Sequence, residues 1–255
     1  SLILLTILAN SIVASAQKID FDMSNRNTSE VTANGYTSWM VPQAADDSKT
    51  INNVTIKVEA SRSANILRSQ WSKADVKSQG LMLTGDGFAS YILDNNNTPN
   101  QTNQVMGIKF TITGLSAGKH TIQAYHNGVN GYTNLAPIDV YVNGTKVVDD
   151  LAQSANAQSV SAAALSYLTI DAKEGEDVVI EYVSDPINGI TYGSSLVYVN
   201  ALIMNQINTQ TQAQDPNPAN KDYHANADKG NITLSWRPSK ESVKQQVYFG
   251  TSADN

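Results

Sequence analysis

Apolar and polar side chains alternate in many short stretches of the chain. Residues 19–23 show the pattern first, because Ile19, Phe21 and Met23 are separated by two aspartates. A period of two is that of a half-buried β-strand, whose successive side chains point to opposite faces. The same alternation predicts further strands within residues 51–60, 105–115, 119–127, 137–148, 166–173, 176–184 and 195–205. We therefore expect residues 17–205 to be built mainly from strands.

Turn-forming residues separate these stretches. Asn143-Gly144 is a strong two-residue hairpin signal, and glycines mark further turns at residues 114–118 and 173–176. The helical signal is weak, because the alanine- and serine-rich residues 151–165 fit an irregular loop as well as a turn or two of helix. Many short strands joined by turns predict an all-β fold, an antiparallel β-sandwich or jelly roll, rather than alternating strands and helices.

The composition changes after this region. Residues 206–220 carry two prolines and many amides, with Ile207 the one large apolar side chain, which is typical of an interdomain linker. Beyond the linker, Ile232, Leu234 and Trp236 alternate with polar residues, and residues 245–255 show a second apolar pattern. Residues 221–255 hold only about three strands, too few to close a sandwich core. We expect a truncated second β-domain there.

Residues 1–16 have a different character. Residues 2–8 read LILLTIL, and Ala14-Ser15-Ala16 fits the small-residue pattern at which signal peptides are cleaved. The apolar run is too short for a membrane-spanning helix. We predict a partial signal peptide, with Gln17 as the mature N-terminus and a secreted protein that is extracellular or periplasmic. The alternative is a buried strand or helix.

Charge and cysteine content exclude several classes of protein. Acidic residues outnumber basic ones by 23 to 17, giving a net charge of −6 and a pI of about 5.0. A broad basic surface for nucleic acid or for an anionic membrane is therefore not expected. The chain has no cysteine, so disulfides and thiol chemistry are excluded. We expect a monomer that neither binds nucleic acid nor inserts into a membrane.

The residue types of common catalytic sites are present but poorly spaced. His120 and His126 lie six residues apart on one predicted strand, about 20 Å from each other, which is too far for one metal ion. The sequence has no G-x-S-x-G nucleophile motif. The adjacent acids at 46–47 and 149–150 are typical of solvated positions, and the glycines of TGDGFAS (residues 84–90) are typical of a turn. We predict no catalytic residues within this chain.

Loop aromatics flanked by amides and glycines are the strongest binding signal. Sugars present C–H patches that stack on aromatic rings, while polar side chains bond to their hydroxyl groups. Three segments, residues 34–40, 68–80 and 124–134, combine these residue types. The predicted carbohydrate-binding residues are Tyr36, Trp39, Arg68, Trp71, Lys73, His126, Asn127, Asn130, Tyr132 and Asn134. The alternative for the tryptophans is packing in the core.

The C-terminal residues resemble a known module. Asp215-Pro216, the TLSW of residues 233–236, Pro238 and the VYFGTS of residues 247–252 are similar to the opening of fibronectin-III-like modules in secreted bacterial carbohydrate-active enzymes. The resemblance implies that residues 221–255 begin a partial immunoglobulin-like sandwich, a spacer or docking unit without catalytic activity.

Residues 17–205 resemble a different module. The segments KIDFDMSNRNTSEVTANGYTSWMV, GLSAGKHTIQAYHN, DVYVNGTKVV and LVYVNALIMN are similar to the N-terminal β-sandwich of secreted polysaccharide-degrading enzymes from Bacteroidetes. The order of elements also resembles galactose-binding or malectin-like jelly rolls.

The resemblance implies a non-catalytic accessory region that binds a polysaccharide or oligosaccharide within a secreted polysaccharide-degrading enzyme. One alternative is that the chain is the N-terminal fragment of a pectin-type polysaccharide lyase whose catalytic domain is missing. A second is a structural spacer or cell-surface adhesion module.

The resemblance also implies a cation. Jelly-roll modules bind structural Ca²⁺ through oxygen ligands near their first and last strands, and Asp20, Asp22 and Asp139 are the candidate ligands here. The alternative is that these acids lie on a solvated strand face. No other cofactor is expected.

Overall fold

The structure is a computed structural model that describes residues 16–23, 26–70, 76–93, 104–129, 131–186, 192, 194–205, 214–217 and 235–237. The chain divides into two compact units, residues 1–206 and residues 207–255. Each unit is described by itself. The predicted signal peptide lies outside the described residues, apart from the exposed Ala16. Among the described residues, no helix has the length and apolar character needed to span a bilayer.

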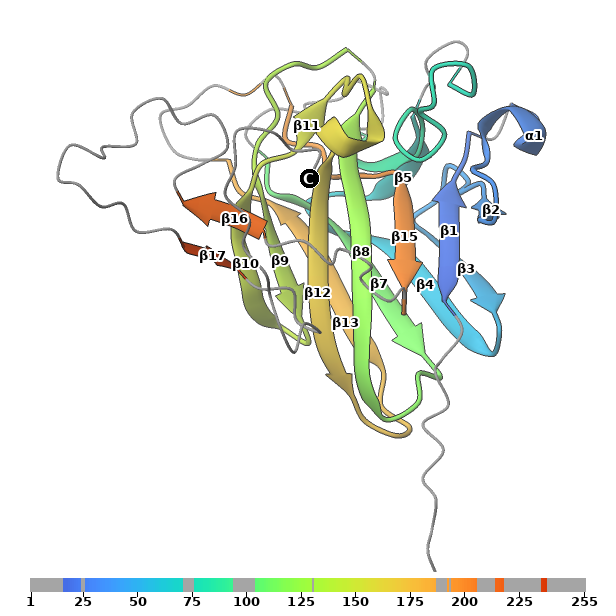
Figure 1. Cartoon of the computed structure of the whole chain (residues 1–255), viewed down its shortest axis with the longest axis vertical. Helices are drawn as coiled ribbons and strands as arrows, with labels where there is room; N and C mark the ends of the chain where they lie inside the picture. The colour runs from blue at the N-terminus through green and yellow to red at the C-terminus, as the bar shows by residue number, and fades with distance from the viewer. Residues whose placement is uncertain are drawn as a thin grey trace, which may run out of the picture. The chain divides into compact units, whose positions relative to one another are not determined.

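Two sheets make up most of the first unit (Figure 1). In the first sheet, β8 lies between β15 on one side and β12 with the short β11 on the other, and β1 and β2 follow beyond β15. Its strands are β1 (Gln17–Phe21), β2 (Thr37–Trp39), β8 (Gly118–Gly128), β11 (Ser154–Ala155), β12 (Ala164–Ala172) and β15 (Ala201–Met204).

The second sheet lies behind the first in Figure 1 and has the order β10-β9-β13-β7-β4-β3. Its strands are β3 (Asp46–Ile51), β4 (Val54–Arg62), β7 (Met106–Thr113), β9 (Ile138–Val142), β10 (Thr145–Leu151) and β13 (Val178–Ser184). A small third sheet contains β5 (Ile66–Ser69), β6 (Phe88–Tyr91) and β14 (Tyr198–Val199). The described residues of this unit contain two short helices, α1 (Thr28–Val31) and the 3₁₀ helix η1 (Val160–Ala162).

The core fills the space between the sheets. Alternate side chains of each strand point inward, as the period-two pattern requires. Phe21 from the first sheet, Phe88 from the small sheet, and Phe110 and Tyr182 from the second sheet are all at most 1% exposed. Their rings contact one another at centroid distances of 4.8 to 6.3 Å. The predicted all-β sandwich is therefore confirmed.

The predicted strands and the observed strands agree closely, with informative exceptions. The Asn143-Gly144 turn joins β9 to β10, and both residues have positive φ, as a type I′ hairpin requires. No alternating pattern predicts β3, because this edge strand carries the polar residues DDSKTI and is held mainly by its ladder with β4. For the alanine-rich residues 151–165 the sequence left open an irregular loop or a turn or two of helix. The structure has one short 3₁₀ helix there, η1, next to the two-residue strand β11 and irregular segments.

The second unit contains two short described strands. β16 (Gln214–Asn217) pairs antiparallel with β17 (Ser235–Arg237). β17 lies within the predicted strand at residues 231–239. β16 lies within residues 206–220, for which composition predicts an interdomain linker, and composition does not reveal the ladder partner of these polar residues. The linker stays a prediction. The predicted fibronectin-III-like character of residues 221–255 stays a prediction.

Candidate functional site

Asp20 of β1 and Asp22, the residue that follows β1, lie on the outer side of the first sheet. Ile19 and Phe21 belong to the core, so the alternating Asp20 and Asp22 point the other way. After β1 the chain passes through α1 and returns as β2, which pairs parallel with β1. We call residues 26–36 the crossover segment. This segment covers the outward acids, because Ala33 N donates to Asp20 Oδ2 at 2.6 Å and Thr32 Oγ1 donates to Asp22 Oδ2 at 2.6 Å.

A third acid reaches the same place from the loop before β6. Asp86 lies between two glycines, and Gly87 has a φ of +134°. A Cβ on Gly87 would lie 2.5 Å from the carbonyl oxygen of Val199, so only glycine allows this close approach. The Asn200 amide donates to the Asp86 carbonyl, and the Asn127 amide donates to the Thr84 carbonyl. These contacts fix the loop against β8 and the segment between β14 and β15.

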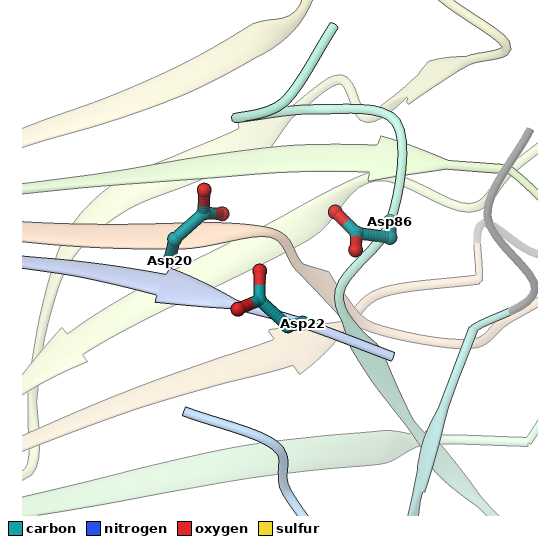
Figure 2. A group of neighbouring side chains, drawn as sticks. All are labelled: Asp20, Asp22 and Asp86. Carbon is teal, nitrogen blue, oxygen red and sulfur yellow. The ribbon is translucent and has the colours of Figure 1, made fainter. Parts of the chain in front are cut away.

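Asp20, Asp22 and Asp86 together form what we call the tri-aspartate centre (Figure 2). One carboxylate oxygen of each lies within 4.8 Å of one oxygen of the other two, and the residues are at most 1% exposed. The Oδ2 atoms accept hydrogen bonds: Asp20 from Ala33 N, Asp22 from Thr32 and Ser38, and Asp86 from Met23 N at 3.3 Å. The three Oδ1 atoms are buried and have no hydrogen-bond partner in the described part of the chain.

Burial makes the charged forms of these acids costly. Burial, with the neighbouring Asp86 and Asp22 charges, raises the pKa of Asp20 to about 9. Burial and the Asp22 charge raise the pKa of Asp86 to about 8. Burial also raises the pKa of Asp22, although hydrogen bonds from Ser38 and Thr32 and the charge of Lys49 oppose the shift. Without a counter-charge, the centre therefore holds protons at neutral pH.

The centre fits a hard divalent cation better than it fits catalysis. Three buried carboxylates with unpartnered oxygens leave a large desolvation cost, which protons or a bound cation would offset. Ca²⁺ and Mg²⁺ prefer carboxylate and other oxygen ligands. Because the three side chains are covered, a polymeric substrate from solvent does not reach them. Asp20, Asp22 and Asp86 would hold the ion, which would supply positive charge and a structural link.

Asp139 is not part of this centre, which corrects the predicted set of calcium ligands. Asp139 lies in β9 of the second sheet and belongs to a separate acidic group with Asp150 and Asp185. Lys146 Nζ lies 2.6 Å from Asp139 Oδ2 and 2.8 Å from Asp149 Oδ1. A lysine therefore already supplies a counter-charge to Asp139.

The outer side of the first sheet carries aromatic side chains next to the tri-aspartate centre. Strand register places Tyr167 of β12 beside Gln123 of β8, and Leu165 beside Tyr125. These residues alternate with core residues such as Ile122 and Leu168, so they point outward. They are half-buried, except Leu165, which is 37% exposed.

Tyr36 joins this surface from the loop before β2. Lys18 Nζ of β1 lies 5.6 Å from the centre of the Tyr36 ring. Burial, with Tyr125 and Asp20 as neighbours, raises the pKa of Tyr36 to about 12, so its hydroxyl stays protonated. We define the tyrosine face as these residues of the first sheet and its crossover: Lys18, Tyr36, Gln123, Tyr125, Leu165 and Tyr167.

Three of the predicted sugar-binding residues are instead buried in the sandwich. Trp39 is 3% exposed, packs on Phe21 with ring centroids 5.4 Å apart, and donates from Nε1 to Asp47 Oδ2 at 2.8 Å. His126 is fully buried, and its two ring nitrogens lie 2.8 Å from the Tyr198 carbonyl oxygen and 2.9 Å from Ser166 Oγ. Burial lowers the pKa of His126 to about 4.

Asn127 is also fully buried, and its side chain bonds to Thr84, Ser154 and Ala157. The sequence placed Asn127, with Trp39 and His126, in solvent-facing positions. The structure corrects this placement, because the polar atoms of all three bond within the protein. None of them faces a ligand in solvent.

The other predicted residues do not gather at one point. Arg68 is exposed, with its guanidinium 5.9 Å from the Tyr91 ring centre. Tyr132 is half-buried against a small hydrophobic cluster that includes Tyr91, and Asn134 is exposed. Of the predicted residues that the structure describes, Tyr36 alone belongs to the tyrosine face. Trp71, Lys73 and Asn130 lie outside the described residues.

Sequence reasoning missed Asp86, Tyr125 and Tyr167. Asp86 lies in the segment TGDGFAS, where the glycines indicate a turn but not what the turn approaches. Tyr125 in β8 and Tyr167 in β12 occupy outward-facing positions, each between two inward-facing residues. The signal in the sequence for both tyrosines is an aromatic residue at an outward strand position rather than in a loop.

No protein-family model and no curated protein sequence matches this chain. Solved structures similar to it include a family 35 carbohydrate-binding module from Clostridium thermocellum, with a TM-score of 0.34, 14% identity, and coverage of 63% of this chain and 98% of that one. The module TmCBM61 in complex with beta-1,4-galactotriose has a TM-score of 0.34, 8% identity, and coverage of 58% and 86%. A module of family 35 from Paenibacillus barcinonensis has a TM-score of 0.28, 16% identity, and coverage of 46% and 76%. These scores are too low to carry an inference about the ligand of this chain.

Proposed function

We propose that residues 17–205 form a non-catalytic module that binds a polysaccharide on the tyrosine face. The observation that carries this proposal is the set of three tyrosines, Tyr36, Tyr125 and Tyr167, on the outer side of one sheet. Polar side chains, those of Lys18 and Gln123, lie among them. Apolar ring surface with interspersed donors and acceptors matches the alternating C–H and hydroxyl surfaces of a sugar polymer.

An extended surface suits a polymer better than a small ligand. Tyr167 and Tyr125 lie on adjacent strands, two positions apart in register, and Tyr36 approaches from the far side of β1. Successive sugar units could contact successive tyrosines, and weak contacts would add along the polymer. A module of this kind linked to a catalytic domain raises the local concentration of substrate without new chemistry.

Affinity electrophoresis of the full chain in gels with and without polysaccharide tests the proposal. The panel contains β-1,4-galactan, arabinan, polygalacturonate and cellulose derivatives. We expect at least one polymer to slow the protein, and Tyr125→Ala to reduce the retardation strongly. Tyr141→Ala, on the outer side of the second sheet, is the matched control and should leave it unchanged. No retardation by any polymer would contradict the proposal and favour a spacer or adhesion module.

A secreted polysaccharide-degrading enzyme, such as a pectin-type lyase, is the parent protein that we propose for this module. The signal-peptide pattern of residues 1–16 and the fibronectin-III-like motifs of residues 215–252 support this context. Sequencing the gene upstream and downstream of the part that encodes residues 1–255 tests this proposal. A downstream domain with a polysaccharide-cleaving active site is the expected result.

We also propose that the tri-aspartate centre binds Ca²⁺ as a structural ion. The specific support is the three buried Oδ1 atoms that lack a hydrogen-bond partner, which Figure 2 shows on carboxylates turned toward one another. Calorimetric titration of the metal-free protein with CaCl₂, repeated with MgCl₂, tests it. Binding at pH 7 should release protons, because Asp20 and Asp86 must ionise to hold the cation.

Asp86→Asn should weaken binding of the cation, whereas Asp139→Asn, in the separate acidic group, should not. Equal affinity in the wild type and in Asp86→Asn would contradict the proposed site.

A further inference from the structure

The crossover segment and the tri-aspartate centre share the same side chains. Ala33 N bonds to Asp20, and Thr32 Oγ1 bonds to Asp22. Ser38, at the start of β2, also donates to Asp22. The buried carboxylates of Asp20 and Asp22 therefore bond to both ends of residues 32–38, a stretch that runs from the crossover segment into β2.

The two oxygens of each carboxylate have different roles. The Oδ2 atoms of Asp20 and Asp22 accept the hydrogen bonds from the crossover segment, while the Oδ1 atoms are buried without a partner. In Figure 2 the three carboxylates of the centre turn toward one another. A cation held by the Oδ1 atoms would fix the rotation of each carboxylate, and so would keep each Oδ2 directed at the segment.

Tyr36 lies inside the segment that these bonds hold. It follows Ala33 by three residues, precedes Ser38 by two, and its amide donates to the Ala33 carbonyl at 3.1 Å. Its side chain lies beside Lys18, and Asp20 and Tyr125 are its electrostatic neighbours. Tyr36 is thus the one tyrosine of the tyrosine face that does not belong to a sheet strand, and its position depends on the crossover segment.

We propose that a divalent cation in the tri-aspartate centre positions Tyr36, and that glycan affinity depends on the cation through this residue. The inference rests on the proposed function, since it concerns the same binding face. Without the cation, the Oδ1 atoms have no partner in the described part of the chain and nothing fixes the rotation of each carboxyl group. The Oδ2 bonds then weaken, and residues 32–38 leave their place beside Lys18 and Tyr125. Tyr125 and Tyr167, which lie in strands, stay in place.

Hydrogen exchange of the full chain with CaCl₂ alone tests the structural half of the inference. Adding CaCl₂ to chelator-treated protein should slow exchange of the backbone amides of residues 32–38 by about tenfold or more, as expected when a local opening loses population. The amides of β4 and β7 in the second sheet are the internal control and should not change. Equal exchange of residues 32–38 with and without Ca²⁺ would overturn the proposal.

A thermodynamic cycle tests the functional half, with soluble β-1,4-galactan or whichever neutral polymer of the panel retards the protein. Chelation should weaken binding of the wild type about tenfold, as the loss of one aromatic contact does. Tyr36→Ala should weaken it by the same factor and remove the dependence on Ca²⁺. Tyr141→Ala should bind like the wild type and keep the dependence.

The outcomes separate the two proposals. Binding that is equal with and without Ca²⁺ overturns the coupling and leaves the glycan-binding function standing. A Tyr36→Ala protein that still loses affinity on chelation also overturns the coupling, because the cation then acts through other residues. No binding of any polymer, with or without Ca²⁺, overturns the proposed function and the coupling with it. Circular dichroism of the chelated protein checks that the sandwich stays folded.

Discussion

The outer sides of the two sheets differ sharply, although both sheets contribute alternate side chains to one core. On the second sheet, Glu59 bonds to Lys57 and Lys109, with N–O distances of 3.1 and 2.8 Å. Arg62 pairs with Glu181 through two hydrogen bonds. We call these residues the charged face. The first sheet instead carries the tyrosine face.

The difference lies in the kinds of side chain that the two outer sides carry. On the charged face, donors and acceptors are already paired with each other, and Tyr141 lies between the cations of Arg62 and Lys146. Exposed ion pairs of this kind contribute little to stability but keep a sheet face soluble. The tyrosine face combines half-buried aromatic rings with a lysine and an amide, which is the chemistry of a binding surface. The first sheet is therefore the side on which we propose that a glycan binds.

The largest effect should come from the core that supports both faces. Phe110 is 1% exposed and contacts Phe21, Phe88 and Tyr182. Phe110→Ala should lower the free energy of unfolding by about 3–5 kcal/mol, since it removes a large buried ring and leaves a cavity. Urea denaturation followed by tryptophan fluorescence measures it. Lys109→Ala, one residue away on the charged face, should cost less than about 1 kcal/mol; similar losses for both variants would contradict the assigned burial.

The next effect is a pH dependence that belongs to the tri-aspartate centre. The pKa of Asp86 is about 8 in the folded protein against 3.8 for an ordinary aspartate. Between these values the folded state holds a proton that the unfolded state has lost. In cation-free buffer this stabilising contribution is complete below pH 3.8 and is lost as pH rises toward 8, at about 1.4 kcal/mol per pH unit.

Asp86→Asn should remove that contribution, so the difference in stability between wild type and variant should change with pH. Denaturation curves at pH 5, 6 and 7 in chelator measure it. Saturating CaCl₂ should reverse the trend for the wild type, because the cation favours the ionised carboxylates. If the difference in unfolding free energy between wild type and variant stays constant from pH 5 to 7, Asp86 is already ionised in the folded protein over this range, and the prediction is wrong.

A smaller effect separates the two faces by binding. Tyr125→Ala should reduce glycan affinity by about tenfold, the loss typical of an aromatic contact residue, with little change in stability. Tyr141→Ala makes the same truncation on the second sheet and should change affinity less than about twofold. Isothermal titration with the polymer that retards the protein measures both. The reverse result would move the binding surface to the charged face.

The smallest effect should come from the charged face itself. Arg62→Ala removes the ion pair with Glu181, in which the Arg62 side chain is 42% exposed. The substitution should lower the free energy of unfolding by at most about 1 kcal/mol and should leave glycan affinity unchanged. Thermal denaturation at low and high salt measures the change, and the wild-type advantage should shrink as salt screens the pair. A salt-independent loss of several kcal/mol would mean that the pair is structurally essential.

Much of the fold was predictable from local pattern. Strands such as β4 and β7 alternate buried apolar residues with polar ones over most of their length, so period two identifies them. The hairpin at Asn143-Gly144 follows from backbone conformations that few residues adopt. The edge strand β3 and the short strand β16 were not predictable, because polar residues are held there by a neighbouring strand rather than by burial of a face.

The candidate site was less predictable than the fold. The outward phase of β1 pointed to Asp20 and Asp22, but the same reasoning selected Asp139, which lies in the opposite sheet. Alternation tells which residues leave the core, and not which strands become neighbours. His126 and Asn127 looked like loop ligands because their glycine-rich surroundings resemble a binding loop, whereas strand β8 extends through both residues and buries them.

The sequence by itself determined the strands, the inward phase of each and the identity of the residues that form the core, because these follow from a period along the chain. Tertiary structure alone decided that the turn at Asp86 meets β1 and that Tyr36, Tyr125 and Tyr167 share one surface. The physical reason is that such encounters depend on the order of strands in the sheets and on the path of the crossover segment. Both result from the packing of the whole domain rather than from the preferences of neighbouring residues.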